Sequence, residues 1–310
     1  MNITFEQAIE NYLKFVKLKR KRSSYRTIAN RINTHILPYV KNKKIQEFTA
    51  FDYLEWQAII NDQNYSISYK KTLHTCFVTF LNYCINFYDL KNNVASKCGN
   101  FKDEEPQKKN GNVWTLNEFM EFINFVDEPI YKTLFNFMFF TGCRLGETLG
   151  LTFSNIHDDK IEIVNNATRF FDNKGNRLIT TTKTKKSTRI ISVDKVLKKE
   201  IESIRDYYNT KYVDFNNNFY IFGGRQPIAP TTLTRKKDKW CELANVKRIT
   251  IHEFRHSHAC LLFQNNVPID EISSRLGHSK ISMTTDIYLR FIPKDEKRVI
   301  NTLNNLRLSS

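Results

Sequence analysis

The sequence lacks the features of a membrane protein and of a protein that depends on disulfides. No apolar run reaches the ~18 residues that a membrane-spanning helix needs, and residues 1–10 have no basic segment followed by an apolar core. No C-x-x-C pair occurs, which disfavours a zinc ribbon or a disulfide framework; the six cysteines are scattered at Cys76, Cys84, Cys98, Cys143, Cys241 and Cys260. We therefore expect reduced, buried thiols and a cytoplasmic protein.

Acidic residues are scarce relative to basic ones. The 310 residues include 48 Lys and Arg against 32 Asp and Glu, which gives a formal net charge of +16, and 41% of the chain is hydrophobic. That apolar fraction is enough for a real core, while the charge excess is typical of globular proteins that meet a polyanion. Nucleic acid is therefore the expected partner, and a generally basic surface without such a partner is the alternative.

Residues 1–90 carry the apolar periodicity of four helices, each preceded by a residue that can cap it. Thr4 and Gln7 form a capping-box pattern ahead of the first helix. The later caps are expected at Ser24, at Thr49, and at Ser66 or Ser68, with Pro38 ending the second helix. Residues 17–22 hold five cations in six positions. We expect them to form an edge that contacts phosphates rather than a merely solvated turn.

Residues 91–112 contain almost no large apolar side chain, which predicts an extended linker to a second domain at 113–310. In that domain Thr115 is expected to cap a helix, and a further, apolar helix stops at Thr141-Gly142. A small antiparallel sheet is predicted from four β-type segments, at 161–164, 167–171, 178–182 and 189–193. The predicted fold class is therefore mainly α with a small antiparallel β-sheet (α+β).

The second domain also carries residues that can act on a phosphodiester. They are Arg144, directly after the helix stop, His252 and Arg255, His278, and Tyr288. An arginine offers a planar double donor that matches phosphate, and a tyrosine offers a nucleophilic oxygen. With the histidines, these groups can perform DNA strand transfer without a metal. For Arg144 taken alone, an ion pair with Glu147 is the simpler explanation.

Two further features have alternatives. Lys183 lies at a strand end, where its ammonium could reach a ligand, and the alternative is an ordinary solvated hairpin lysine. Residues 252–256 also match H-E-x-x-H, the zinc-peptidase motif, with Glu253 as base and Glu271 or His278 as third ligand. That arrangement would put the cation of Arg255 beside a dication, and a peptidase does not explain the charge of +16. The zinc interpretation is therefore less favoured.

In their order and spacing, these pieces resemble the tyrosine recombinases of the phage integrase family. The resemblance covers nearly the full chain. It depends on Thr-Gly-x-Arg-x-x-Glu at 141–147, a hairpin with Lys183, His-x-x-Arg-His at 252–256, Leu-Gly-His at 276–278, and Tyr288. It implies an N-terminal helical core-binding domain at 1–90 and a mixed α/β catalytic domain at 113–310, which close around DNA as a clamp.

The resemblance implies the covalent chemistry as well. Tyr288 would attack the scissile phosphate to form a 3′-phosphotyrosyl bond and a free 5′-hydroxyl, and strand exchange would pass through a Holliday junction. The ester is conserved, so neither a nucleotide cofactor nor a metal ion is expected. Arg144 and Arg255 would hold the non-bridging oxygens, and Glu147 would buttress Arg144.

Proton transfer and further phosphate contacts are assigned to the other candidates in the same way. His252 and His278 would hydrogen-bond the phosphate, with His252 the better general base for a tyrosine of pKa ~10. Lys183 would protonate the leaving 5′-oxygen, although Lys185 and Lys186 are close enough in sequence to compete for that role. The residues expected to serve only packing and helix orientation are His256 and His258.

The implied partners are double-stranded DNA core sites and other copies of the chain. A homotetramer would assemble on two DNA sites in the bacterial nucleoid, with directionality or host bending factors as additional partners and no membrane contact. The C-terminal tail, residues 293–306, is implied to dock on a neighbouring protomer. Because the first core-type helix begins at Thr4, we expect no additional domain for accessory arm sites ahead of it.

The kind of recombinase is left open by the sequence. The Lys183-Thr184-Lys185 hairpin resembles integrases of Gram-positive phages and islands, which favours a mobile-element integrase. A Xer-like resolvase of chromosome or plasmid dimers is the nearest alternative. A type IB topoisomerase, or a DNA-binding protein that retains the fold without cleavage, would differ more in activity.

Overall fold

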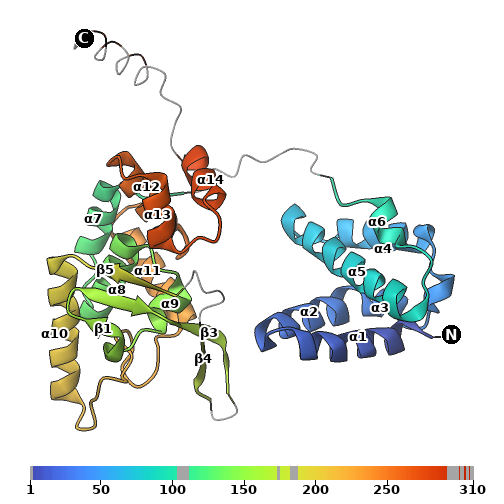
Figure 1. Ribbon diagram of the computed structural model, residues 1–310, viewed down its shortest axis with the longest axis horizontal. Helices are drawn as coiled ribbons and strands as arrows, with labels where there is room; N and C mark the ends of the chain where they lie inside the picture. Colours follow the sequence, from blue (N-terminus) through green and yellow to red (C-terminus); the bar gives the residue numbers. More distant parts are fainter. Residues whose placement is uncertain are drawn as a thin grey trace. The chain divides into compact units, whose positions relative to one another are not determined.

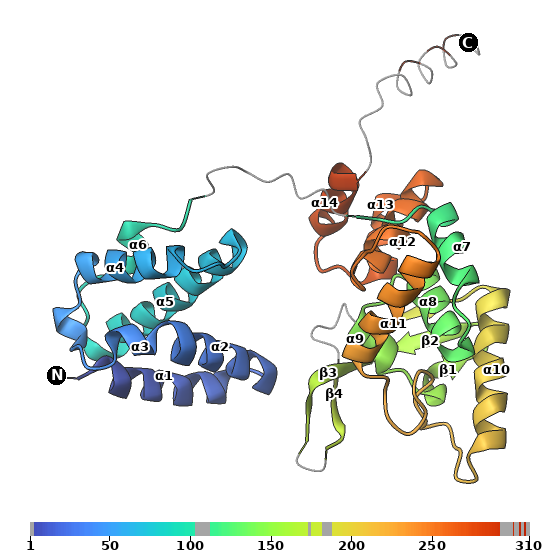
Figure 2. The same cartoon turned by 180° about the vertical axis from the view of Figure 1, so that it is seen from behind.

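The computed structural model describes residues 3–102, 112–172, 175–181 and 188–291, together with positions 300, 304 and 307; for Arg169, Tyr288 and Arg290 it describes the backbone alone. The chain divides into two compact units, Met1–Lys108 and Lys109–Ser310. Both are dominated by helices, and the second also contains antiparallel strands (Figures 1 and 2). The predicted α+β fold class is confirmed. No helix among the described residues is long and apolar enough to span a bilayer.

The first unit is a bundle of helices around an aromatic core (Figure 1). Its helices are α1 (Phe5–Lys19), α2 (Arg22–His35), α3 (Leu37–Val40), η1 (Ile45–Glu47), α4 (Ala50–Asn61), α5 (Ile67–Tyr88) and α6 (Val94–Cys98). Trp56 is fully buried, and its ring packs edge-on against Phe77 with 4.9 Å between centroids. Residues 17–22, at the junction of α1 and α2, all lie at the surface.

Local capping residues set the starts of three of the predicted helices. Capping boxes form at Thr4 and Thr49, and the hydroxyl of Ser66 accepts a backbone hydrogen bond at the start of α5. The cap predicted at Ser24 is wrong, because α2 begins before that residue and has no side-chain cap. Tyr25 packs against the core, so the turn around it already belongs to the helix.

The segment predicted as an extended linker is folded in its first half. Residues 94–98 form α6, and Ala95 is completely buried against α4 and α5. Asn93 caps α6 by accepting from the N–H of Ser96, and it donates to the carbonyl of Val78 at 2.9 Å. A single small side chain is enough to anchor this helix, which a scan for large apolar residues misses. Residues 103–111 lie outside the described residues, so that part of the linker stays a prediction.

The second unit places a small sheet and a hairpin among helices. The three-stranded antiparallel sheet has the order β1 (Ile156–His157), β2 (Lys160–Ile163), β5 (Arg189–Ser192), and the hairpin pairs β3 (Asn165–Phe171) with β4 (Arg177–Thr181). The helical elements are α7 (Leu116–Asn124), α8 (Pro129–Thr141), α9 (Leu145–Leu149), η2 (Phe153–Asn155), α10 (Lys195–Lys211), α11 (Pro230–Leu243), α12 (Glu253–Gln264), α13 (Ile269–Leu276) and α14 (Ser282–Phe291). In both views α12, α13 and α14 lie together at one end of the unit (Figures 1 and 2).

The strands form two sheets rather than the single sheet that we predicted. β2 pairs with β5, with Ile161 opposite Ile191, whereas β3 and β4 pair as a separate hairpin. The hairpin packs on α9 instead of continuing the sheet. The approach is so close that a Cβ atom on Gly146 would lie 2.3 Å from the side-chain oxygen of Asn166. The helix that follows Arg144 is therefore held by the hairpin.

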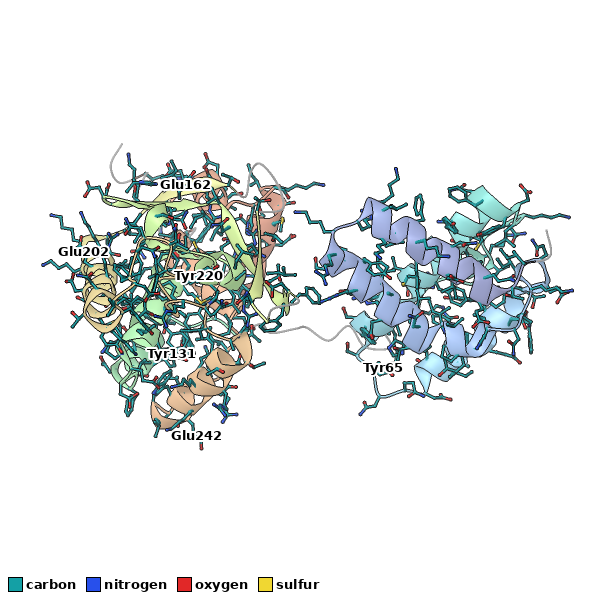
Figure 3. The ribbon with its side chains drawn as sticks, turned by 90° about the horizontal axis from the view of Figure 1, so that it is seen from below. Tyr65, Tyr131, Glu162, Glu202, Tyr220 and Glu242 are labelled. Carbon is teal, nitrogen blue, oxygen red and sulfur yellow. The ribbon has the colours of Figure 1, made fainter. Side chains whose placement is uncertain are left out.

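Helix α8 is the buried centre of the second unit. Phe135, Phe137 and Phe139 are completely buried, and Phe139 stacks on Phe119 of α7 with 3.8 Å between centroids. Charged side chains such as Glu202 of α10 and Glu242 of α11 lie at the outside (Figure 3). A helix packed on all sides is a rigid support for the turn at its C-terminal end.

Candidate active site

The turn after α8 brings three segments of the chain into contact. Gly142 ends α8 with φ 66°, in the left-handed region. A Cβ atom at this position would lie 2.6 Å from a ring carbon of His258 and 2.6 Å from a methyl carbon of Leu276, so only glycine fits. The turn that leads into Arg144 therefore packs directly on α12 and on the end of α13.

Arg144 is fixed by Glu147 at the start of α9. Its N–H donates to Glu147 Oε2 at 3.0 Å and its Nη1 donates to Oε1 at 2.7 Å. Burial raises the pKa of Glu147, but the nearby cations Arg189 and Arg144 outweigh burial and hold that pKa below its ordinary value. The carboxylate is therefore ionised at neutral pH. The ion pair that the sequence suggested is present, and 32% of the Arg144 side chain remains exposed.

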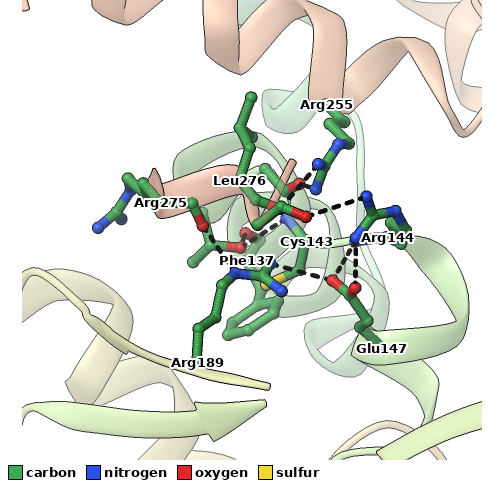
Figure 4. A network of polar contacts seen from close by, with 11 residues as sticks. Phe137, Cys143, Arg144, Glu147, Arg189, Arg255, Arg275 and Leu276 are labelled. Carbon is green, nitrogen blue, oxygen red and sulfur yellow. Dashed lines mark hydrogen bonds and ion pairs between the residues drawn. The ribbon is translucent and has the colours of Figure 1, made fainter. Parts of the chain in front are cut away.

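Arg255 is buried beside Arg144 and ties the same turn to α13. It is 1% exposed; its Nη1 donates to the carbonyl of Gly142 at 2.9 Å and its Nη2 to that of Leu276 at 2.7 Å (Figure 4). Burial, followed by the charge of Arg144, lowers the pKa of Arg255 to about 9, so the guanidinium is still charged at neutral pH. Arg144 Nη2 lies 3.5 Å from the carbonyl of Gly277. The two guanidinium groups thus lie close together at the end of α13, and two neighbouring cations favour the binding of an anion there.

Two histidines flank the arginines and are neutral. His278 follows α13; it is buried, and its Nδ1 lies 2.7 Å from the hydroxyl of Thr284. Burial and the charges of Arg255 and Arg144 lower the pKa of His278 to about 3. His252 precedes α12, and its side chain is exposed to solvent. Even so, partial desolvation by the protein, and then the positive charges of Arg255 and Arg144, lower its pKa. Both imidazoles are therefore neutral at pH 7, and each has one ring nitrogen that can accept a hydrogen bond and one that can donate.

The other two histidines of this segment have packing contacts. His258 is buried, with Nδ1 2.8 Å from the carbonyl of Phe139 and Nε2 accepting from Arg275 at 3.3 Å. Because a carbonyl can only accept, Nδ1 carries the proton; burial lowers the pKa of His258 to about 3. The His256 ring packs edge-on against that of His252, with 4.8 Å between centroids.

Two predicted site residues are only partly placed, or not placed. Tyr288 lies on α14, whose backbone packs against α12 and α13, and its side chain is not described. Lys183 lies outside the described residues, together with its neighbours Lys185 and Lys186. The structure therefore brings together Arg144, His252, Arg255 and His278, and it puts the helix that carries Tyr288 beside them.

In the H-E-x-x-H segment, Glu253 bonds to backbone groups that lie outside α12. The carboxylate of Glu253 accepts from the backbone N–H of Thr250 at 2.5 Å and of Asn112 at 3.2 Å, at the start of α12. The first contact closes the turn that leads into α12, and the second ties that turn to the backbone ahead of α7. Within the described ranges, no three His, Cys, Asp or Glu side chains are grouped as metal ligands.

Arg189 belongs to this centre and was missed by the sequence analysis. It enters from the first position of β5 and donates to the Oε2 of Glu147 at 3.0 Å. The only signal in the sequence is a cation at the start of an apolar strand segment, and many exposed strands share that signal.

Two arginines and two neutral histidines around one turn, with a tyrosine on the adjoining helix, are the set expected of a tyrosine recombinase. The chain belongs to the phage integrase family: residues 112–293 match its sequence profile, and residues 4–60 match the phage integrase N-terminal SAM-like domain. The protein is therefore a tyrosine recombinase, an enzyme that cleaves and rejoins DNA.

Relatives with curated names span both integrases and Xer-type proteins. The ICEBs1 integrase of Bacillus subtilis strain 168 is 28% identical over 313 residues, covering 98% of this chain and 84% of its own length. A tyrosine recombinase XerC-like protein of Caldanaerobacter subterraneus is 28% identical over 302 residues, covering 88% of this chain and 76% of its own length. Similarity to both kinds of protein over most of the chain supports the family and leaves the biological role open.

Solved structures share the fold at low sequence identity. The Tn1549 transposon integrase in complex with transposon right end DNA matches with a TM-score of 0.74 and 16% identity, covering 98% of this chain and 100% of the other. A lambda integrase fragment, crystallised as a dimer bound to a COC′ core site, matches with a TM-score of 0.70 and 14% identity over 95% of this chain and 99% of the other. At these identities the likeness concerns the fold alone.

Proposed function

We propose that the protein is the integrase of a mobile element, which recombines two double-stranded DNA core sites as a homotetramer. The observation that carries the proposal is the convergence of Arg144 and Arg255 on the carbonyls of Gly277 and Leu276, next to the neutral imidazole of His278. Donors fixed before the substrate arrives are what charge stabilisation in a phosphoryl transition state requires. The similarity to the ICEBs1 integrase favours integration over the resolution of dimers.

In the proposed mechanism, Tyr288 attacks the scissile phosphate and displaces the 5′-oxygen of the next nucleotide. The bond from phosphorus to the 5′-oxygen breaks as the 3′-phosphotyrosyl bond forms, so the ester is conserved and no nucleotide cofactor is needed. His252 takes the phenolic proton, and Lys183 gives a proton to the leaving oxygen. Arg144 and Arg255 hold the non-bridging oxygens as their charge grows.

His278 is assigned a donor role in this mechanism. When its Nδ1 accepts a hydrogen bond from the hydroxyl of Thr284, its own proton lies on Nε2 and can form a hydrogen bond to a phosphate oxygen. The lowered pKa of the imidazole keeps that tautomer available throughout the neutral range. This assignment distinguishes His278 from His252, which acts as the base.

The helical first unit is proposed to contact DNA through its basic edge, residues 17–22. All six side chains are exposed, and in the described part of the chain no acidic group lies within 4.0 Å of these cations. Phosphate contacts of this kind position a protein on DNA without reading the sequence. We propose domains at 1–90 and 113–310 for core-site binding and catalysis, action on nucleoid DNA in the bacterial cytoplasm, and directionality or bending factors as further partners.

A nicked suicide substrate that carries one core half-site tests the function. An integrase or a Xer-type recombinase becomes covalently attached to this substrate and joins two duplexes, a topoisomerase becomes attached without joining two duplexes, and a non-cleaving protein only binds. The XerC-like relative makes resolution of dimers the second candidate. Sequencing the junctions of the DNA around the gene separates the two: an integrase leaves two non-identical attachment sites at the ends of an element.

A further inference from the structure

Arg189 links three parts of the active site through one guanidinium group. Its Nη2 donates to Glu147 Oε2 at 3.0 Å and lies 3.6 Å from the sulfur of Cys143, and its Nε donates to the carbonyl of Arg275 at 2.7 Å (Figure 4). Its side chain is only 8% exposed, so these contacts are shielded from water. They connect β5 to α9, to the turn that carries Arg144, and to the end of α13.

We propose that Arg189 is a positioning residue for DNA cleavage: it holds the buried carboxylate of Glu147 on Arg144 and ties that pair to the end of α13, where His278 follows. The inference rests on the proposed function, because it takes Arg144 as the residue that holds the scissile phosphate. Arg189 itself does not touch DNA in this proposal. It acts through Glu147.

The carboxylate of Glu147 needs Arg189 to stay ionised, because the charge of Arg144 alone does not offset the cost of burying it. The Glu147 side chain is 3% exposed, whereas that of Arg144 is 32% exposed and its charge is partly hydrated. Burial raises the pKa of Glu147, and Arg189 is the strongest of the influences that lower it, ahead of Arg144. Without Arg189, Glu147 would be protonated at a higher pH. A neutral carboxyl group no longer holds a guanidinium by charge.

The groups that face Glu147 from the elements around it are few. Arg144 approaches from the start of α9, Arg189 from β5 and Arg255 from α12, and the thiol of Cys143 lies in the preceding turn. Burial raises the pKa of Cys143, so the thiol is neutral and adds no charge. In the proposed mechanism Arg144 and Arg255 bind the phosphate, whereas Arg189 does not. Its removal therefore changes Glu147 without removing a phosphate ligand.

The test is the pH dependence of single-turnover cleavage, measured with saturating protein on the suicide substrate. Arg189→Met keeps the length of the side chain and removes its charge. In the wild type, protonation of His252, the base, sets the acidic limb; in this variant we expect Glu147 to be protonated first, so that the limb moves to higher pH and the rate at a fixed pH on it falls by about ten-fold. An acidic limb at the same pH as the wild type would overturn the proposal.

A second substitution shows whether Glu147 is the titrating group. In the double variant Arg189→Met with Glu147→Gln no carboxyl group is left to protonate, so the acidic limb should return to its wild-type position even if the maximal rate stays low. Arg189 also contributes to the lowered pKa of His278. If the limb stays shifted in the double variant, His278 and not Glu147 causes the shift, and the proposal is wrong.

Arg275→Met is the matched control. Its guanidinium is half-buried and donates to the carbonyls of Phe140 and Ser192 without meeting a carboxylate. This variant should unfold at a lower temperature and keep the wild-type acidic limb. A shifted limb here would make the effect a general consequence of losing a buried arginine and would overturn the proposal.

A variant that does not fold and a wild type that does not cleave can both be told apart from a failure of the proposal. If Arg189→Met does not fold, Arg189→Lys decides: a lysine supplies charge to Glu147 but cannot also reach the carbonyl of Arg275, so the limb should stay in place while the maximal rate falls about ten-fold. A maximal rate equal to that of the wild type would contradict the proposal. If the wild type itself forms no covalent adduct, the proposed function fails, and this failure is visible before any variant is compared.

Discussion

The Nδ1 of His278 and the hydroxyl of Thr284 lie 2.7 Å apart inside the protein, and both groups are buried. This hydrogen bond joins the end of α13 to α14, the helix on which Tyr288 lies. It therefore connects a proposed phosphate donor with the element that carries the proposed nucleophile.

Thr284→Val should lower cleavage by weakening this connection. Valine keeps the shape of threonine and removes the hydroxyl, so His278 loses the partner that fixes its tautomer. Loss of one hydrogen bond is worth about 1 kcal/mol, or about five-fold in rate. Thr285→Val is the control, because the hydroxyl of Thr285 donates to the carbonyl of Ile281, just ahead of α14, and to no other group in the part of the chain that the structure describes. Equal rates of the two variants in single-turnover cleavage would show that the bond has no role.

Arg144→Ala and Arg255→Ala should each lower cleavage by about a hundred-fold or more, because their donors are needed most where charge develops. Binding to the core site, measured by gel shift, should change much less. If binding and cleavage fall by the same factor, the arginines only position the DNA.

The two variants should differ in stability. Arg255→Ala leaves the buried carbonyls of Gly142 and Leu276 without their donor, which costs about 3 kcal/mol in the free energy of unfolding. Arg144 is partly exposed, and its loss should cost about 1 kcal/mol. Urea unfolding followed by fluorescence of Trp114 and Trp240, both in the second unit, measures the difference.

Acidification should destabilise the second unit through two histidines. The folded-state pKa of His258 and of His278 is about 3, against an ordinary value of 6.5. Both stay neutral in the folded protein, and the unfolded chain gains their protons as pH falls below 6.5. Stability is therefore lost between pH 6.5 and about 3, with a slope that approaches about 1.4 kcal/mol per pH unit for each histidine.

Urea unfolding at several pH values between 7 and 5.5, where most carboxylates stay ionised, gives this slope. His258→Gln should reduce it by the increment of one histidine, at most about 1.4 kcal/mol per pH unit. His157→Gln removes an exposed histidine and should leave it unchanged. A free energy of unfolding that is flat over this interval would contradict the neutral assignment of the buried imidazoles.

DNA binding should become less sensitive to salt when the basic edge is neutralised. Lys19→Gln with Lys21→Gln should reduce the slope of log affinity against log salt by about two, because each lost phosphate contact removes about 0.9. The control is Lys195→Gln with Lys199→Gln on α10, where the side chains are equally exposed. A slope that falls equally in the two pairs would show that the edge is not a specific contact surface.

Local signals in the sequence located much of the fold. Capping boxes at Thr4, Thr49 and Thr115 mark helix starts because the bonds involved span three residues. The stop at Gly142 was equally local. The two-sheet arrangement and α6 were missed, since each depends on tertiary contacts: the packing of α9 on the hairpin, and the burial of Ala95. Such contacts leave no periodic trace in the chain.

In the candidate site, too, residues within short motifs could be predicted, and residues defined by tertiary contacts could not. Arg144, His252, Arg255 and His278 were found because each belongs to a short motif, and the structure gathers them around one turn. Arg189 and Glu147 are 42 residues apart, and their contact follows only from the register of β5 against the body of the unit. Thr284 was missed for a similar reason: one hydroxyl in a threonine-rich helix start gives no sign of its partner.

The most direct measurement of the proposed chemistry is covalent capture of DNA by the wild type and by Tyr288→Phe. The substitution deletes one oxygen, so the variant should bind a core site as the wild type does. On the nicked suicide substrate, the wild type should give an adduct that survives denaturation, with the label on the peptide that contains residue 288 after proteolysis. Tyr288→Phe should give none. An adduct in the Phe variant, or one that maps to another peptide, would show that a different residue is the nucleophile.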